Sequence, residues 1–213
     1  DYNGSPKAVQ SQVGTAKFKD VNNDGKITNG GDNDDRTIIG DPTPKFTFGI
    51  TNSFNYNSFD LSIVMSGSYG NDIANMGEQG LTNLDGVFNV LAEVKDRWRS
   101  EANPGAGKYG KTTAGTANER DWFSTRFLSD ASYLTVKNVS LGYTFSKIKI
   151  KNIKNLRVYV SAQQLYTLTK YKGMNPEISS DPFGNAASAL NLGHDYGGYP
   201  VPRTISFGLN LGL

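Results

Sequence analysis

Apolar residues alternate with small or polar residues along five stretches of this chain, and this alternation predicts five β-strands. Successive side chains of a strand point to opposite faces, so each stretch would carry one apolar face and one polar face. The last stretch reads TISFGLNLGL and places its isoleucine, phenylalanine and leucines on the same face. We expect strands at residues 46–56, 59–69, 135–145, 156–166 and 204–213, and a weaker sixth strand that ends at Phe18.

The connections between these stretches are alternately short and long. Only Asn57 and Ser58 separate the first two stretches, which is the spacing of a tight hairpin. Stretches of about ten residues have the length that a tilted strand needs to cross a bilayer. Because outer-membrane barrels have short periplasmic turns and long outer loops, the chain is predicted to be all-β, with about six strands of a large antiparallel transmembrane β-barrel. The outer loops would lie at about 20–44, 70–132 and 167–203, and the periplasmic turns at about 57–58 and 146–155.

A soluble antiparallel sandwich would show the same period of two, because the period does not tell whether the apolar face meets lipid or a second sheet. Two features favour the barrel. The opposite face is small and neutral, as at Thr47, Gly49, Thr51 and Ser53, and aromatic residues gather at the ends of the stretches. The alternative that stays open is a secreted, calcium-stabilised β-sandwich acting as a binding module or adhesin.

The loop at 70–132 carries a helical pattern of its own. Asn83 or Asp85 is a suitable N-cap, and Asn103-Pro104-Gly105 would stop a helix. The apolar side of this helix would pack the core of the loop, or alternatively form a docking surface for a partner outside the membrane. The residues at helical spacing are Leu84, Val87, Phe88, Leu91, Val94 and Trp98.

Composition narrows the function classes. The chain of 213 residues is 37% hydrophobic and contains no apolar run of membrane-helix length, so a spanning structure would have to be a barrel. The net charge of +2 does not indicate a nucleic-acid partner, and the absence of cysteine excludes disulfides. We expect the lysines of the link to face water or lipid head groups rather than nucleic acid; they are Lys147, Lys149, Lys151 and Lys154.

Catalytic residues are few. His194 is the only histidine, and no serine lies in a nucleophile-elbow context, so we expect no enzyme. An enzyme acting on polysaccharide would need a pair of acids, and the neighbours Asp34 and Asp35 are better explained as ion ligands or solvated charges. His194 is expected to be a surface residue.

The segment DVNNDGKIT at 20–28 resembles the start of a calcium loop. Asp20, Asn22 and Asp24 occupy positions one, three and five, Gly25 permits the sharp turn, and Lys26 would supply its carbonyl. These are hard oxygen donors, which suit Ca²⁺ rather than a transition metal. The alternative is an acidic, solvated turn that binds no ion.

The twelfth position of this loop departs from the motif. A bidentate acid is expected there, and the residue is Gly31. Asp32, Asp34 or Asp35 would have to close a lengthened loop, and the predicted ligand set is Asp20, Asn22, Asp24, Lys26, Asp32 and Asp35.

Seven blocks of sequence follow one another along nearly the whole chain. They are DVNNDGKI at 20–27, DRTIIGDPTPKF at 35–46, FDLS at 59–62, GSYGNDI at 67–73, DASYLTVKNVSLGYTF at 130–145, LRVYVSAQQLYTLTKYKG at 156–173 and RTISFGLNL at 203–211. Together they resemble the C-terminal part of SusC/RagA-type TonB-dependent outer-membrane transporters. Two departures are the insertion at Gly30-Gly31 and the last residue, Leu213, where the family commonly has an aromatic.

The resemblance implies a plugged barrel of about twenty-two strands, of which this chain supplies the last six and their outer loops. It implies import of glycans or peptides across the outer membrane, with a SusD-like lipoprotein over the extracellular loops. The remaining barrel and the plug, which contacts TonB, would belong to the part that precedes Asp1, and the C-terminus would be periplasmic. Outer-membrane lipid would surround the apolar face. Lumen-facing candidates are Asp60, Arg157, Tyr159 and Gln163.

Overall fold

The computed structural model describes residues 13–28, 30–32, 34–84, 89–112, 123–146, 153–178 and 192–212. The chain divides into two compact units. We call residues 1–40 and 74–128 the loop unit, and residues 41–73 and 129–213 the sheet unit. Among the helices of the described part, none is both long enough and apolar enough to span a membrane.

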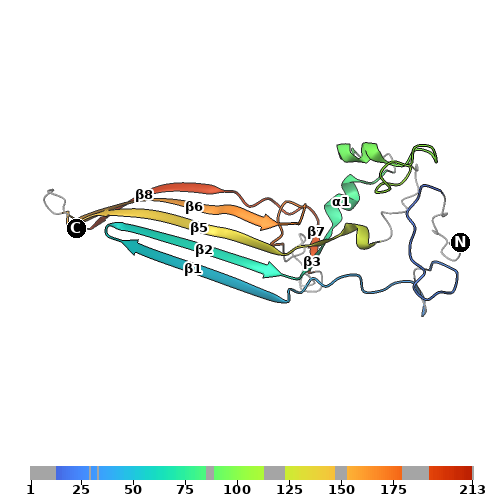
Figure 1. The fold of residues 1–213 in the computed structure, drawn as a ribbon, viewed down its shortest axis with the longest axis horizontal. Coiled ribbons are helices and arrows are strands. Elements are labelled where there is room, and N and C mark those ends of the chain that lie inside the picture. The colour runs from blue at the N-terminus through green and yellow to red at the C-terminus, as the bar shows by residue number, and fades with distance from the viewer. Residues whose placement is uncertain are drawn as a thin grey trace. The chain divides into compact units, whose positions relative to one another are not determined.

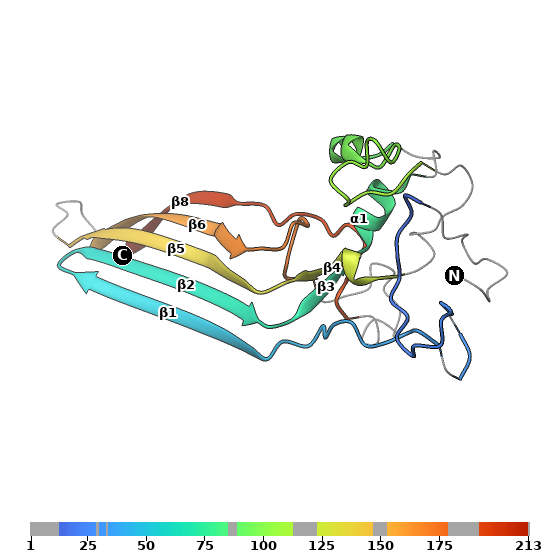
Figure 2. The same cartoon turned by 45° about the vertical axis from the view of Figure 1, so that its right-hand side comes forward.

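The sheet unit is built on one antiparallel five-stranded sheet, whose strands lie side by side in a single layer (Figures 1 and 2). Its order is β1-β2-β5-β6-β8, so these five strands lie side by side in the same order as along the chain. The five predicted strands are therefore confirmed, with β5 and β6 longer than expected and Leu213 outside the described residues. Their bounds are β1 Phe46–Tyr56, β2 Phe59–Tyr69, β5 Tyr133–Phe145, β6 Asn155–Thr169 and β8 Thr204–Gly212.

The tight hairpin between β1 and β2 turns at Asn57, which has a positive φ of 51°. Asparagine tolerates this left-handed conformation better than most residues, which suits it to a short connection. The strands β1 and β2 then pair without a register shift from Tyr56↔Phe59 to Phe46↔Tyr69. This uninterrupted register keeps the apolar side chains of the hairpin on one face, except Val64, which pairs with Thr51 on the other face.

One irregularity interrupts the centre of the sheet. The register of β5 with β2 shifts between Val136 and Asn138, which pair with the consecutive residues Met65 and Val64, so Lys137 is an extra residue of β5 relative to β2. Gln164 of β6 has a positive φ of 49°, in the part of β6 where the pairing with β5 skips residues. A bulge of this kind changes the direction of a side chain without ending the strand, and here the residue concerned is a lysine.

A second, three-stranded sheet has the order β4-β3-β7, formed by β3 Asp72–Asn75, β4 Leu128–Asp130 and β7 His194–Asp195. Within the sheet unit, Ile73, Ala131 and Tyr171 form a buried cluster. The Tyr171 hydroxyl donates to Asp195 Oδ2 at 2.5 Å, and both residues are buried. Asp195 Oδ1 also accepts from the backbone amides of Gly197 and Gly198. Several distant segments of the sheet unit are thus tied together at one end of the long strands.

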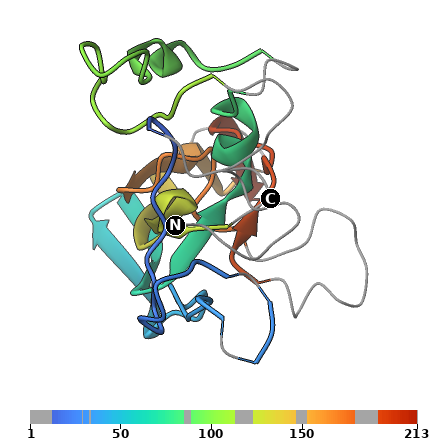
Figure 3. The same ribbon diagram turned by 90° about the vertical axis from the view of Figure 1, so that its right-hand side faces the viewer.

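In the described part of the loop unit the helices are short (Figure 3): α1 Met76–Leu81 and the 3₁₀ turns η1 Ala92–Asp96 and η2 Thr125–Phe127. Asn75 caps α1 by accepting from the Glu78 amide at 2.9 Å. The buried side chains of this unit include Ile27, Val94, Tyr109 and Phe127.

Two expectations for the loop unit were wrong. The continuous amphipathic helix from Leu84 to Trp98 does not form: Leu84 and residues 89–91 are not helical, while 85–88 lie outside the described residues. Leu91 is extended, and its amide donates to the carbonyl of Leu81, ten residues earlier, instead of to a carbonyl four residues earlier as in a helix. The expected strand ending at Phe18 is not seen: residues 13–20 are not assigned to a strand, and the Gly14 carbonyl accepts from the Lys111 amide.

Candidate functional site

The register of the five-stranded sheet aligns its side chains in rows that cross all five strands. One row consists only of serines: Ser53, Ser62, Ser140, Ser161 and Ser206. The adjacent row lies on the opposite face and is apolar throughout: Phe54, Leu61, Leu141, Val160 and Phe207. We call these two sides the polar face and the apolar face of the sheet. They are the candidate functional surfaces of the chain.

Among the described residues, no layer of protein packs over the apolar face. Phe207 is 83% exposed, Phe54 is 56% exposed and Leu141 is 45% exposed. A sandwich would have buried these side chains against a second sheet, so the alternative of a β-sandwich module is not supported. Single exposed apolar residues are common on soluble proteins, but a continuous apolar surface over five strands marks a site of contact with a protein or a membrane.

Aromatic rings gather at both ends of the apolar face. At the turn end, Tyr143 contacts Phe59 and Phe145 edge-on, with ring centroids 4.7 and 4.6 Å apart. At the other end, Phe46 and Tyr69 stack with centroids 5.4 Å apart. Two aromatic zones separated by an aliphatic band are typical of a surface that spans a bilayer.

The polar face carries an ion pair near the turn end. Arg157 of β6 reaches across β5 to Asp60 of β2, and its Nε donates to Asp60 Oδ1 at 2.8 Å. The guanidinium carbon also lies 4.8 Å from the centroid of the Tyr159 ring. The candidates Asp60, Arg157 and Tyr159 are thus brought together. Gln163 lies further along the same face, between Asn138 and Thr204 in the register.

Two glycines make room for these large side chains. A Cβ at Gly142 of β5 would lie 2.5 Å from both Arg157 Nη2 and Asp60 Oδ1. A Cβ at Gly208 of β8 would lie 2.2 Å from the Tyr159 ring. Gly142 and Gly208 are therefore required by long side chains on neighbouring strands. Sequence reasoning identified the small residues but not the side chains that lie over them.

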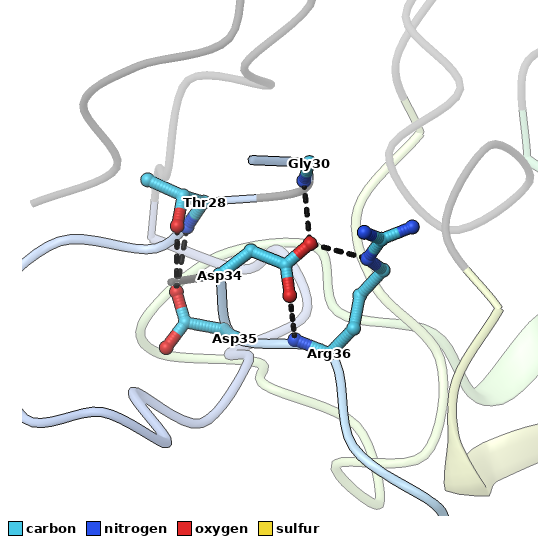
Figure 4. A network of polar contacts seen from close by, with 5 residues as sticks. All are labelled: Thr28, Gly30, Asp34, Asp35 and Arg36. Carbon is cyan, nitrogen blue, oxygen red and sulfur yellow. Dashed lines mark hydrogen bonds and ion pairs between the residues drawn. The ribbon is translucent and has the colours of Figure 1, made fainter. Parts of the chain in front are cut away.

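The segment from Asp20 to Asp35 in the loop unit folds around its aspartates (Figure 4). Asp35 Oδ2 accepts from the Thr28 amide at 2.6 Å, and Asp35 Oδ1 accepts from the Val21 amide at 2.7 Å. These backbone hydrogen bonds, first from Thr28 and then from Val21, lower the pKa of the Asp35 carboxyl. Asp34 instead accepts from the Gly30 amide and from Arg36.

Among the predicted ligands, Asp20 fits a cation best. Its Oδ2 accepts from the Gly25 amide at 2.9 Å, while its Oδ1 is buried and has no hydrogen-bond partner. Asn22 and Asp24 bond each other and the loop backbone, with Asp24 Oδ1 accepting from the Lys26 amide. Asp35 lies across the loop, whereas Asp32 is exposed. Within the described residues, no three His, Cys, Asp or Glu side chains form a group that could hold a metal ion, so the donor set depends on Asn22 and a carbonyl.

The remaining candidates are His194 and the lysines of the link. His194 lies in β7 with its ring centroid 6.1 Å from that of Tyr196. Of the link lysines, Lys154 donates its backbone amide to Gly212, while Lys147, Lys149 and Lys151 lie outside the described residues.

Comparison with known proteins gives consistent relatives. No protein-family model matches the chain. It is 34% identical over 203 residues to TonB-dependent receptor P3 of Formosa agariphila, covering 94% of this chain and 19% of the receptor. It is 33% identical to receptor P26 of the same species, covering 93% of this chain and 20% of the relative. It is 28% identical over 224 residues to TonB-dependent receptor SusC of Bacteroides thetaiotaomicron, covering all of this chain and 18% of SusC.

The fold agrees with these relatives. The structure of the RagAB peptide transporter contains a chain with a TM-score of 0.64 and 24% identity, covering 82% of this chain and 18% of that one. The "closed-closed" state of the RagAB peptide importer gives a TM-score of 0.62 at 23% identity, with the same coverage. The chain belongs to the SusC-like TonB-dependent receptors.

The match to this family confirms the predicted fold class, a segment of a large antiparallel transmembrane β-barrel. The chain spans about a fifth of the length of the curated relatives it matches. These relatives are named as receptors, and the expectation that the chain is not an enzyme stays a prediction. The side of the membrane on which each loop lies remains a prediction.

Proposed function

We propose that this chain forms part of the barrel wall and the outer loops of an outer-membrane, TonB-dependent nutrient importer. In this proposal the apolar face meets the acyl chains of the bilayer, and the polar face lines the lumen. The hairpin turn at 57–58 is periplasmic, and the loop unit is extracellular. The chain itself holds the wall closed and presents polar groups to the cargo, while energy enters through TonB and the rest of the receptor.

The observation that carries this proposal is the separation of the sheet into one polar and one apolar face over all five strands. Burying a Leu or Phe side chain away from water contributes about 1.5–3 kcal/mol, so a face of this size is unfavourable in contact with water. A barrel wall resolves this because every second residue meets lipid and every other one meets a hydrated interior. The sequence relationship to TonB-dependent receptors supports the same arrangement.

Cysteine substitutions test the orientation of the two faces. Ser140 and Leu141 are neighbours in β5 that belong to the polar row and the apolar row. In the full-length receptor, freed of other cysteines and held in outer membranes, Ser140→Cys should react with a water-soluble thiol reagent. Leu141→Cys should react only with a lipophilic one. Equal reaction of both with the water-soluble reagent would contradict a lipid-facing wall.

The cargo is proposed to be a glycan or a peptide, delivered under a SusD-like lipoprotein that covers the extracellular loops. The similar structures are those of the RagAB peptide importer and transporter, so peptide is the cargo of those proteins. Growth of a receptor-deletion strain on glycan or peptide as the limiting nutrient would distinguish the two. Copurification of a lipoprotein with the tagged receptor would test the partner; a receptor that isolates alone and still imports would contradict it.

We also propose that the loop from Asp20 to Asp35 binds Ca²⁺ as a structural ion. Asp20, Asn22 and Asp24 would supply side-chain oxygens, Lys26 its carbonyl, and Asp35 rather than Asp32 would close the loop. The buried, unpartnered Oδ1 of Asp20 supports this, because burial of a carboxylate oxygen without a partner is unfavourable. A bound cation would remove that cost and would hold the acidic residues together.

The ion is tested by direct binding. Titration of chelator-treated full-length receptor with Tb³⁺, a luminescent substitute for Ca²⁺, should give a saturable signal that Ca²⁺ displaces. Asp20→Asn should abolish the signal, whereas Asp32→Asn should leave it unchanged. A signal that is lost with Asp32→Asn but kept with Asp35→Asn would assign the closing acid to Asp32 instead.

A further inference from the structure

Residues 171–178 follow β6 and return over the polar face of the sheet. They begin at Tyr171, whose amide donates to Thr169 Oγ1 and whose hydroxyl donates to Asp195. They end at Ile178, which lies against Gly198: a Cβ on that glycine would be 2.6 Å from Ile178 Cδ1. Both ends of this segment are thereby fixed within the sheet unit.

Glu177 connects β5, the central strand of the sheet, to this segment. Its Oε1 accepts from Thr135 Oγ1 at 2.7 Å, and Thr135 Oγ1 lies 3.0 Å from Thr167 Oγ1. Thr135 pairs with Ser66 of β2 and Thr167 of β6, and Ser66 lies on the same face as Ser62, so these hydroxyls belong to the polar face. Thr135 is fully buried, at 0% exposure, although most of its neighbours on this face are half-exposed.

Lys137 supplies the second contact with Glu177. It forms an ion pair with Glu177 Oε2, and the two side chains are 27% and 19% exposed. Lys137 is the extra residue of β5 relative to β2. A bulge of this kind redirects a side chain, and here the Lys137 side chain points to Glu177. Asn175 Oδ1 accepts from the Glu177 amide at 2.9 Å and sets the backbone from which Glu177 projects.

We propose that residues 171–178 form a strap that Glu177 latches onto the polar face through Lys137 and Thr135. This inference rests on the proposed function in one respect, that the polar face lines the lumen. The latched strap then covers the wall beside Thr135 and narrows the channel, and opening of the latch uncovers it. The latch depends on the carboxylate of Glu177. Its ion pair with Lys137 is partly exposed to water, and such pairs are weak, so another charged group can replace one partner.

A cysteine at Ser66 reports whether the strap is closed, because Ser66 is the register neighbour of Thr135. The experiment uses the full-length receptor in outer membranes, without other cysteines, and measures the rate of reaction with a charged, water-soluble thiol reagent. Glu177→Gln should raise the rate at this position about tenfold, since a hydrogen bond to a charged group is lost. Lys137→Met should raise it in the same direction, and the charge-swapped pair K137E/E177K should restore slow labelling.

Asp60→Asn provides the matched control, because it breaks the other ion pair of the same face, near the turn end of the sheet. It should leave labelling at Ser66 unchanged. Retention of the heat-modifiable electrophoretic mobility of the folded barrel identifies the variants that assemble. Equal labelling at Ser66 in the native receptor, Glu177→Gln and Lys137→Met would overturn the strap.

A second reporter separates this failure from failure of the proposed function. Ser62→Cys lies on the same face and pairs with Ser140, away from Thr135 in the register. If Ser62→Cys reacts readily while Ser66 is insensitive to the latch variants, the strap is wrong and the hydrated face stands. If Ser62→Cys does not react with the water-soluble reagent at all, the lumen assignment fails, and the strap proposal fails with it.

Discussion

Different kinds of interaction stabilise the sheet unit and the loop unit, each within itself. In the sheet unit, four antiparallel pairings repeat the same backbone ladder, and the side chains follow in rows of one character. In the loop unit, side chains bond the backbone directly, as Asp35 does to Val21 and Thr28 and Asn75 does to Glu78. A repeated ladder tolerates many sequences of the right period, whereas a side-chain-capped loop depends on a few particular residues.

This comparison predicts that the sheet is most sensitive to charge on its apolar face. Val139→Arg in the full-length receptor should destabilise the folded barrel by about 2–4 kcal/mol, because Val139 lies on the apolar face between the two aromatic zones, where a cation meets acyl chains. Ser140→Arg, one residue away on the polar face, should cost less than about 1 kcal/mol. Urea unfolding in lipid vesicles measures both, and similar losses for the two variants would contradict the two-faced wall.

The next largest effect is expected where side chains pack closely on the polar face. Gly142→Ala should destabilise the sheet by about 1–3 kcal/mol, because the new methyl group overlaps Arg157 and Asp60. Gly49→Ala is the matched control on the same face, since the nearest atom to its added Cβ is 3.9 Å away. Most of the penalty at Gly142 should vanish in an Asp60→Ala, Arg157→Ala background. An equal penalty there would show that the ion pair is not what requires the glycine.

A smaller loss of stability is expected where the sheet unit is held by a side-chain hydrogen bond, between Tyr171 and Asp195. Tyr171→Phe removes the hydroxyl that donates to buried Asp195, and this should cost about 1–2 kcal/mol. Tyr199→Phe is the control, because that side chain is 88% exposed. Hydrogen exchange of residues 192–198 in the full-length receptor gives the local measurement. Unchanged protection in Tyr171→Phe would mean that the amides of Gly197 and Gly198 suffice to hold Asp195.

The mildest effect concerns the loop unit and its response to pH. The folded-state pKa of Asp35 lies below its ordinary value of 3.8, so its carboxylate stabilises the loop fully above that value. The contribution is lost as the pH falls through the lowered folded-state pKa. After correction for intrinsic rates, hydrogen exchange of residues 20–28 should therefore be similar at pH 7 and pH 5 and faster near pH 3.

Asp35→Asn should give the fast exchange of residues 20–28 already at pH 7, while the exposed Asp32→Asn should not. The strands of the sheet unit should keep their exchange rates in both variants, because their ladder involves neither residue. Loss of protection in β1 or β2 with Asp35→Asn would contradict the independence of the two units' stabilising interactions.

The strands were predictable because their signal is local and repeated. In β1, β2 and β8 the alternation alone located the strand to within a residue of its observed bounds. It also placed Asp60, Arg157 and Tyr159 on one face, since residues with odd and even positions separate in a strand. The extension of β6 to Thr169 was missed because the bulge near Gln164 shifts the alternation there.

The loops were less predictable because their partners are distant in the sequence. The spacing of Leu84, Leu91, Val94 and Trp98 fits a helix, but Leu91 bonds back to Leu81 and the Trp98 ring lies against Gly14. The motif at Asp20 identified the acidic loop, and only the fold distinguished Asp35, which crosses the loop, from exposed Asp32. The Lys137–Glu177 pair had no sequence signal, because its members are 40 residues apart.

The sequence by itself determined the strands, their two faces and the family, because period, length and residue type are written locally in each segment. Tertiary structure decided which residues meet across strands: Arg157 with Asp60 over Gly142, Tyr159 over Gly208, and Glu177 with Lys137. The physical reason is that these contacts depend on the strand register and on a single-residue bulge. A shift of one residue would leave the composition of every strand unchanged and would turn its side chains to the other face.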